Sequence, residues 1–107
     1  MAGLKENAQA KLLVLLALQA VIYFSASWCG PCRFIEPALK QMASTFADVE
    51  FIKIDVDELA EVAGEWKVEA MPTFILVKRG KEVSRVVGAN KGELERNVEK
   101  QRLLISA

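Results

Sequence analysis

Apolar and polar positions along the chain predict a series of short strands. Residues 20–26 and 49–56 are mostly apolar runs, which is typical of strands buried on both faces of a sheet. Residues 73–78 and 82–87 are two further strand-like runs, and only three residues around Gly80 separate them. This spacing is typical of a hairpin, so we expect the last two strands to pair antiparallel.

Helices are predicted in the remaining segments. Residues 4–17 place leucines and alanines near one face of a helix. Pro31 suits the first turn of a second helix, which would extend to about residue 46. Residues 58–66 are expected to form a short helix. Asn90, with a glutamate three residues later, resembles a capping box and predicts the start of the last helix.

The order of these elements favours one α/β fold. Helices and strands alternate, and the chain ends with two strands and a helix, which predicts a central mixed sheet with helices on both faces. The length of 107 residues fits a single domain over residues 1–107 with one core.

The apolar run at residues 12–18 raises the question of a membrane or targeting segment. It is too short for a membrane span, which needs about 20 apolar residues, and Gln19 interrupts it. A signal peptide is an alternative, because Lys5 and Lys11 precede the run and small residues follow it. A buried helix and strand is the favoured interpretation.

The charges are balanced. Lys plus Arg and Asp plus Glu each number 14, so the formal net charge is zero. Like charges form no block, so neither a nucleic acid nor a membrane is expected as a partner.

Cys29 and Cys32 are the only cysteines, and the chain has no histidine. A structural zinc ion needs four Cys or His ligands, and one chain offers two, so no metal is expected within it. The spacing therefore favours redox chemistry of a dithiol. Two inert core thiols, or a metal or cluster shared between two chains, are the alternatives. The redox interpretation needs no cofactor, because both electrons reside in the two sulfur atoms.

The two cysteines are expected to have different roles. Cys29 would lie just before a helix N-terminus, where unpaired N–H groups and the helix dipole favour an anion and lower the pKa of a thiol. Cys29 would attack a substrate disulfide, and Cys32, in the first helical turn, would resolve the mixed disulfide. Gly30 lets the backbone turn closely, and Pro31 restricts the movement of the two sulfurs.

Other polar residues near these elements are expected to be solvated. Asp55 and Asp57 follow a strand and could suggest a metal or acid–base site, but carboxylates at a strand end ordinarily lie in solvent. Arg33 is likewise expected to be a solvated helix residue; steering of acidic substrates or stabilisation of a thiolate is the alternative.

Several segments together resemble the thioredoxin family. Residues 24–33, Phe-Ser-Ala-Ser-Trp-Cys-Gly-Pro-Cys-Arg, are similar to the thioredoxin active-site segment, and Pro37 matches the proline that kinks the following helix. Residues 70–74 match the cis-proline loop of the family, and residues 87–89 match its glycine loop. The resemblance covers residues 20 to about 100. It includes plant cytosolic h-type thioredoxins and the thioredoxin domains of TPR-containing thioredoxins.

This resemblance implies a thioredoxin fold and a redox-active centre in a cytoplasmic protein. It implies that the protein reduces protein disulfides by dithiol–disulfide exchange. This reaction transports electrons and contributes to cell redox homeostasis. An NADPH-dependent thioredoxin reductase or a related donor would recharge the dithiol. An interaction or co-chaperone module with weak redox activity is the main alternative. An oxidase or isomerase of an oxidising compartment would use the same residues.

The resemblance also assigns residues around the dithiol. The Met71–Pro72 bond is expected to be cis and to lie against the sulfurs. Substrate-binding residues would be Trp28, Met71, Pro72, Gly88 and Ala89, and active-site support would come from Trp28, Gly30, Pro31, Tyr23, Lys53 and Pro72.

Tyr23 departs from the family pattern, because most thioredoxins carry a buried aspartate there. That carboxylate is thought to take the proton of the resolving thiol, whereas a tyrosine, with an ordinary pKa near 10, is a weak base. Lys53 would then lack a negative partner, and resolution by Cys32 would be slower than in relatives with the aspartate.

The N-terminus is a second departure. Thioredoxins usually begin with a strand, but residues 2–19 show no convincing strand pattern. The mixed sheet is therefore expected to have four or five strands. Either the first strand is absent, or the chain is an excised domain. An uncovered sheet edge would favour a dimer or attachment to further domains.

Overall fold

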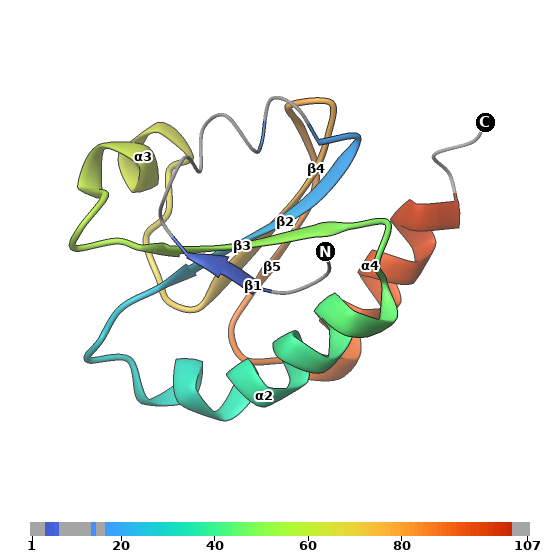
Figure 1. The fold of residues 1–107 in the computed structure, drawn as a ribbon. Coiled ribbons are helices and arrows are strands. Elements are labelled where there is room, and N and C mark those ends of the chain that lie inside the picture. The colour runs from blue at the N-terminus through green and yellow to red at the C-terminus, as the bar shows by residue number, and fades with distance from the viewer. Residues whose placement is uncertain (1–3, 7–13, 15–16, 104–107) are drawn as a thin grey trace.

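The computed structural model describes residues 4–6, 14 and 17–103 (Figure 1). Within these residues, five strands form one mixed sheet in the order β1-β3-β2-β4-β5. The strands are β1 Leu4–Glu6, β2 Gln19–Ser25, β3 Glu50–Asp55, β4 Thr73–Lys78 and β5 Lys81–Val87. β3 is parallel to both β1 and β2, whereas β4 is antiparallel to β2 and to β5. The predicted mixed sheet with an antiparallel final pair is confirmed.

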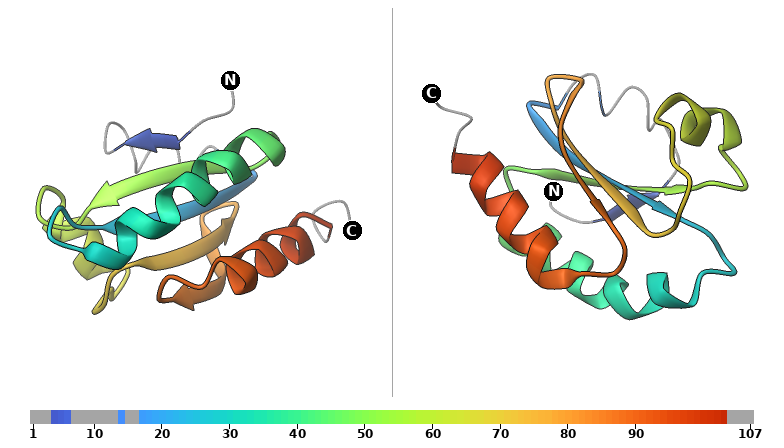
Figure 2. Two further views of the ribbon diagram at one scale, coloured as in Figure 1. Left: turned by 90° about the horizontal axis from the view of Figure 1, so that it is seen from below. Right: turned by 180° about the vertical axis from the view of Figure 1, so that it is seen from behind.

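Helices cover both faces of the sheet, as Figure 2 shows. They are α2 Gly30–Thr45, α3 Ala60–Glu65 and α4 Lys91–Leu103. α2 and α4 lie on one face, and α3 lies on the other. The Asn90 side chain accepts a hydrogen bond from the Glu93 N–H at 3.0 Å, which confirms the predicted start of α4. No helix in the described part of the chain is long and apolar enough to cross a membrane.

The central strand β2 explains how one apolar run fills two layers. Side chains alternate across a strand, so Val21 and Tyr23 join the apolar cluster under α2 and α4. Ile22 and Phe24 join the cluster on the α3 side. All four side chains are buried, and this fixes the end of β2 just before the Cys29 segment.

The first strand corrects the sequence-based expectation. The helix predicted over residues 4–17 is wrong at residues 4–6, which form β1 and pair in parallel with Phe51–Lys53 of β3. Val14 is helical and buried, and residues 7–13 and 15–16 lie outside the described part. A three-residue edge strand is too short to show an alternation of apolar and polar positions, and it is defined by its pairing with β3. The argument for a dimer from a missing edge strand therefore loses its basis.

Candidate active site

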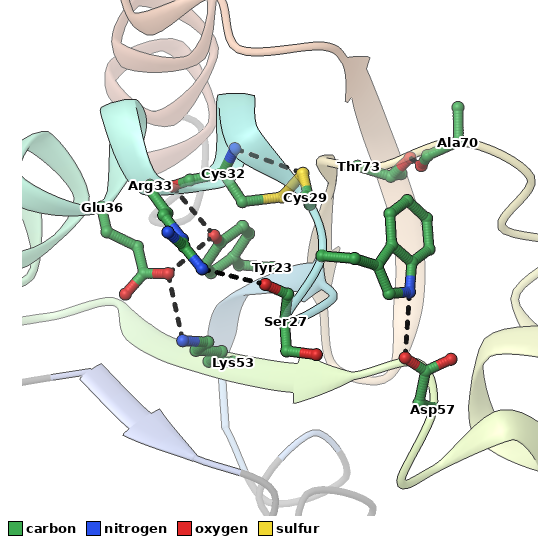
Figure 3. The surroundings of a disulfide bond; sticks show 11 residues. Tyr23, Ser27, Cys29, Cys32, Arg33, Glu36, Lys53, Asp57, Ala70 and Thr73 are labelled. Carbon is green, nitrogen blue, oxygen red and sulfur yellow. Dashed lines mark hydrogen bonds and ion pairs between the residues drawn. A yellow bond between two sulfur atoms is a disulfide. The ribbon is translucent and has the colours of Figure 1, made fainter.

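Cys29 and Cys32 form a disulfide at the N-terminus of α2, with their Cα atoms 5.4 Å apart (Figure 3). Cys29 is the N-cap residue, and its Sγ accepts a hydrogen bond from the Cys32 N–H at 3.2 Å. Pro31 lies in the first turn of α2, as expected, and that turn contains no acidic residue. The helix end therefore directs an N–H group and a positive dipole at the Cys29 sulfur, with no nearby first-turn carboxylate to oppose a thiolate.

Two loops meet beside this disulfide. The Met71–Pro72 peptide bond is cis, as predicted, and Met71 packs against the apolar cluster that contains both cysteines. The Gly88 N–H donates to the Pro72 carbonyl at 2.9 Å, which ties the glycine loop to the cis-proline loop. Gly88 has a φ of 100°, a conformation that favours glycine. Ala89 follows it on the surface.

Trp28 forms an exposed apolar surface next to Cys29, since 65% of its area is accessible to solvent. Its indole Nε1 donates a hydrogen bond to Asp57 Oδ2 at 3.0 Å (Figure 3). Asp57 is exposed, as expected, but it also holds Trp28, which the sequence did not indicate. Asp55 stabilises the turn that follows β3, because its Oδ1 accepts hydrogen bonds from the N–H groups of Asp57 and Glu58.

A family model described as Thioredoxin matches residues 5–100. The chain belongs to the thioredoxin family.

Plant thioredoxins of the H type are among its relatives. The chain is 77% identical to Thioredoxin H2-2 of Oryza sativa subsp. japonica over 78 residues, which are 73% of this chain and 58% of that protein. It is 65% identical to Thioredoxin H2 of Arabidopsis thaliana over 82 residues, which are 77% of this chain and 62% of the relative. The chain thus spans about three-fifths of the length of these curated relatives.

Solved structures agree with the fold. The crystal structure of thioredoxin NaTrxh from Nicotiana alata superimposes with a TM-score of 0.85 at 45% identity, covering 92% of each chain. The thioredoxin fold expected from the sequence is confirmed.

A TPR repeat-containing thioredoxin of rice, TDX, is 51% identical over 83 residues, which are 78% of this chain but 26% of that protein.

In this thioredoxin-family chain, Tyr23 is wholly buried on β2 behind the disulfide. Its ring stacks on Phe74 with centroids 5.2 Å apart. Its hydroxyl donates toward the Cys32 carbonyl at 3.2 Å and toward Glu36 Oε2 at 3.1 Å. Burial raises the pKa of Tyr23 well above its usual range, so the phenol remains protonated at neutral pH.

The expectation that Lys53 lacks a negative partner is wrong. Lys53 Nζ lies 3.0 Å from Glu36 Oε2, and both side chains are about four-fifths buried, with 21% and 22% exposure. Glu36 lies one helical turn after Cys32, so α2 supplies a carboxylate beside Tyr23. The sequence reasoning missed Glu36 because the contact depends on how α2 packs across β2 and β3. The effect of Tyr23 on the resolution rate stays a prediction.

The remaining predictions concern Arg33, a metal site and the residues next to the two sulfurs. Arg33 is exposed, and its Nη2 donates to the Ser27 carbonyl at 3.3 Å. The described residues contain no group of three or more His, Cys, Asp or Glu side chains that could hold a metal ion. A contact between Pro72 and the two sulfurs stays a prediction, as do the roles assigned to Gly30 and Pro31.

Proposed function

We propose that this chain reduces protein disulfides by dithiol–disulfide exchange. The observation that carries the proposal is the placement of Cys29 Sγ at the N-terminus of α2, where it accepts the Cys32 N–H and is bonded to Cys32. In the reduced protein, this position would stabilise the Cys29 thiolate, which is the form that attacks a disulfide.

The proposed reaction has two steps. The Cys29 thiolate attacks one sulfur of the substrate disulfide, forms a mixed disulfide and releases the other sulfur as a thiolate. The Cys32 thiolate then attacks Cys29, restores the Cys29–Cys32 bond and releases the second substrate sulfur. A thioredoxin reductase that uses NADPH, or a related donor, would return two electrons to the pair.

The surface around the disulfide suits an extended protein segment. Trp28 offers an exposed apolar face, and the Gly88–Pro72 hydrogen bond brings the two loops with Met71 and Ala89 together. We propose that these residues bind the segment that carries the substrate disulfide, with Pro72 next to the sulfurs. The Gly88 backbone permits a close approach, because no side chain occupies this position.

We also propose that residues 1–107 act as a single domain in the cytoplasm. The family match over residues 5–100 supports one thioredoxin unit. Attachment to further domains has one supporting observation, the similarity to a TPR repeat-containing thioredoxin. A co-chaperone module of that kind would bind clients through the Trp28 surface without needing the dithiol.

Insulin reduction distinguishes these functions. With dithiothreitol, and then with NADPH and thioredoxin reductase, the parent protein should precipitate insulin chains at a rate proportional to its concentration. Cys29→Ser should abolish this activity, and Cys32→Ser should accumulate a mixed disulfide visible by mass spectrometry. Ser44→Ala, on the exposed side of α2, is the matched control. Equal insulin reduction by both cysteine variants and the parent would refute the redox function.

A further inference from the structure

Phe34 is the most exposed large apolar side chain in the part of the chain that the structure describes, with 87% of its area accessible to solvent. It lies on α2 two residues after Cys32, whereas the next residue, Ile35, is buried in the core. The core-facing side of α2 is therefore turned away from Phe34, and the aromatic ring contributes little to the stability of the fold. A single exposed apolar residue is ordinary, so its surroundings decide whether it has a role.

Phe34 is part of a larger apolar surface. Pro31 and Pro37, three residues before and after it, are also exposed. Residues three apart on a helix are neighbours, so these side chains form one strip, which we call the α2 strip: Pro31, Phe34 and Pro37. The strip begins between the two cysteines, close to the exposed surface of Trp28. Its two prolines lose no side-chain entropy when a partner binds, which lowers the cost of a contact.

The geometry of α2 directs the strip toward the disulfide. The Cα–Cβ bonds of a helix tilt toward its N-terminus, so the Phe34 side chain projects back over the first turn. The approach is open, because a Cβ atom placed on Gly30 would meet no side chain beyond its chain neighbours within 4 Å. Each helical residue adds about 1.5 Å along the axis, so Phe34 lies about 7.5 Å from Cys29 in that direction. An extended chain covers this distance in about two residues.

The charges of α2 favour one kind of partner. Arg33 and Lys40 are exposed, whereas Glu36, the only acidic residue of this fully described helix, is 22% exposed and paired with Lys53. The accessible face of α2 thus combines apolar side chains with positive charge. A segment that complements it carries an apolar side chain and acidic rather than basic neighbours.

We propose that Phe34 is a specificity residue for protein substrates, and that it receives an apolar side chain about two residues from the substrate cysteine in an acidic segment. The inference rests on the proposed function and adds a contact on α2 to it. Contact with the α2 strip removes apolar surface from water in the substrate complex, which favours binding. A substrate without this side chain would still react, but it would bind less tightly.

Two probe peptides test this contact, each joined to a second copy of itself by one disulfide. One carries leucine two residues before and two residues after its cysteine, and the other carries serine at both positions. Both contain glutamate and no basic residue. Acid-quenched samples of the reduced protein give a second-order rate constant for each peptide, and their ratio measures the preference for leucine. In Phe34→Gln the ratio should fall about fivefold, the effect of one significant contact residue, through slower reaction of the leucine peptide.

Two further variants control for other effects of the substitution. Leu18→Gln should keep the parent ratio, because Leu18 is 59% exposed just before β2, whereas the disulfide segment follows the other end of this strand. Phe34→Leu keeps an apolar side chain and should keep most of the preference. Glutamine and leucine both favour helices, so neither change at Phe34 should unfold α2.

A ratio in Phe34→Gln within twofold of the parent overturns the contact and leaves the proposed function intact. An equal loss in Phe34→Leu also overturns it, and so does slower alkylation of Cys29 by iodoacetamide in Phe34→Gln, since the nucleophile itself would then have changed. A parent that sediments as a dimer and a Phe34→Gln variant that sediments as a monomer would assign the strip to a second copy instead. A parent that reduces neither peptide contradicts the proposed function itself.

Discussion

Arg85 on β5 donates hydrogen bonds to the segment that leads to the cis-proline loop. Its Nη2 donates to the Trp66 carbonyl at 2.7 Å, and its Nη1 donates to the Lys67 carbonyl at 3.3 Å. Lys67 has a φ of 55°, a left-handed conformation that a non-glycine residue holds only when surrounding contacts support it. Hydrogen bonds from a charged group contribute about 1.5–3 kcal/mol each. Since the Arg85 side chain is 28% exposed and its Nη1 bond is long, the 2.7 Å bond carries most of this contribution, and Arg85→Met should lower the free energy of unfolding by about 2 kcal/mol.

Urea unfolding of the oxidised protein measures this change, and thermal unfolding should show a melting temperature lower by about 8–16 °C. The KM for insulin should also rise, because the loosened segment carries Met71. Glu82→Gln is the matched control: it removes an ion pair to Arg85 whose side chains are 28% and 35% exposed, and such pairs contribute at most about 1 kcal/mol. Equal losses in the two variants would show that the carbonyl hydrogen bonds do not hold the segment.

Two further predictions concern the surface. Asp57→Ala removes the acceptor of the Trp28 indole, and the loss of a hydrogen bond of about 1 kcal/mol corresponds to roughly a fivefold change in side-chain population. The KM for insulin should therefore rise about two- to fivefold with little change in kcat, and Asp57→Asn should keep the KM close to that of the parent. An equal fall in kcat would contradict a positioning role. The hydrogen bond from Arg102 holds the pKa of Asp48 below its usual range. The pair therefore stabilises the fold above the pKa that Asp48 has in the unfolded chain. This stabilisation is lost as the pH falls through the lower pKa that Asp48 has in the folded protein. Urea midpoints of the parent and Asp48→Asn should therefore differ near pH 6 and converge near pH 2, and a difference unaffected by pH would refute the linkage.

The sequence predicted the elements that depend on local pattern. Residues 73–78 were predicted at the bounds of β4, because its side chains are buried on both faces and residues 74–77 are continuously apolar. Asn90 marked the start of α4, since a cap is a local hydrogen bond. β1 was missed because three residues carry too little pattern, and its strand geometry comes from pairing with β3.

The dithiol site followed from the sequence more completely than the residues behind it. Cys29, Pro31 and Cys32 are neighbours in the chain, so their spacing alone places them at a helix start. Glu36 and Asp57 contact Tyr23 and Trp28 across 13 and 29 positions of sequence, and no local signal reports such contacts. The sequence showed that Tyr23 is unusual, but only the packing of α2 against the sheet showed which carboxylate lies beside it.

The central claim is that the helix end favours a thiolate at Cys29. The rate of iodoacetamide alkylation of Cys29 against pH tests it directly, with Cys32→Ser so that one thiol reacts. The account predicts half-maximal reactivity well below the ordinary thiol pKa of about 8.5. Half-maximal reactivity at or above that value in the folded protein would contradict it.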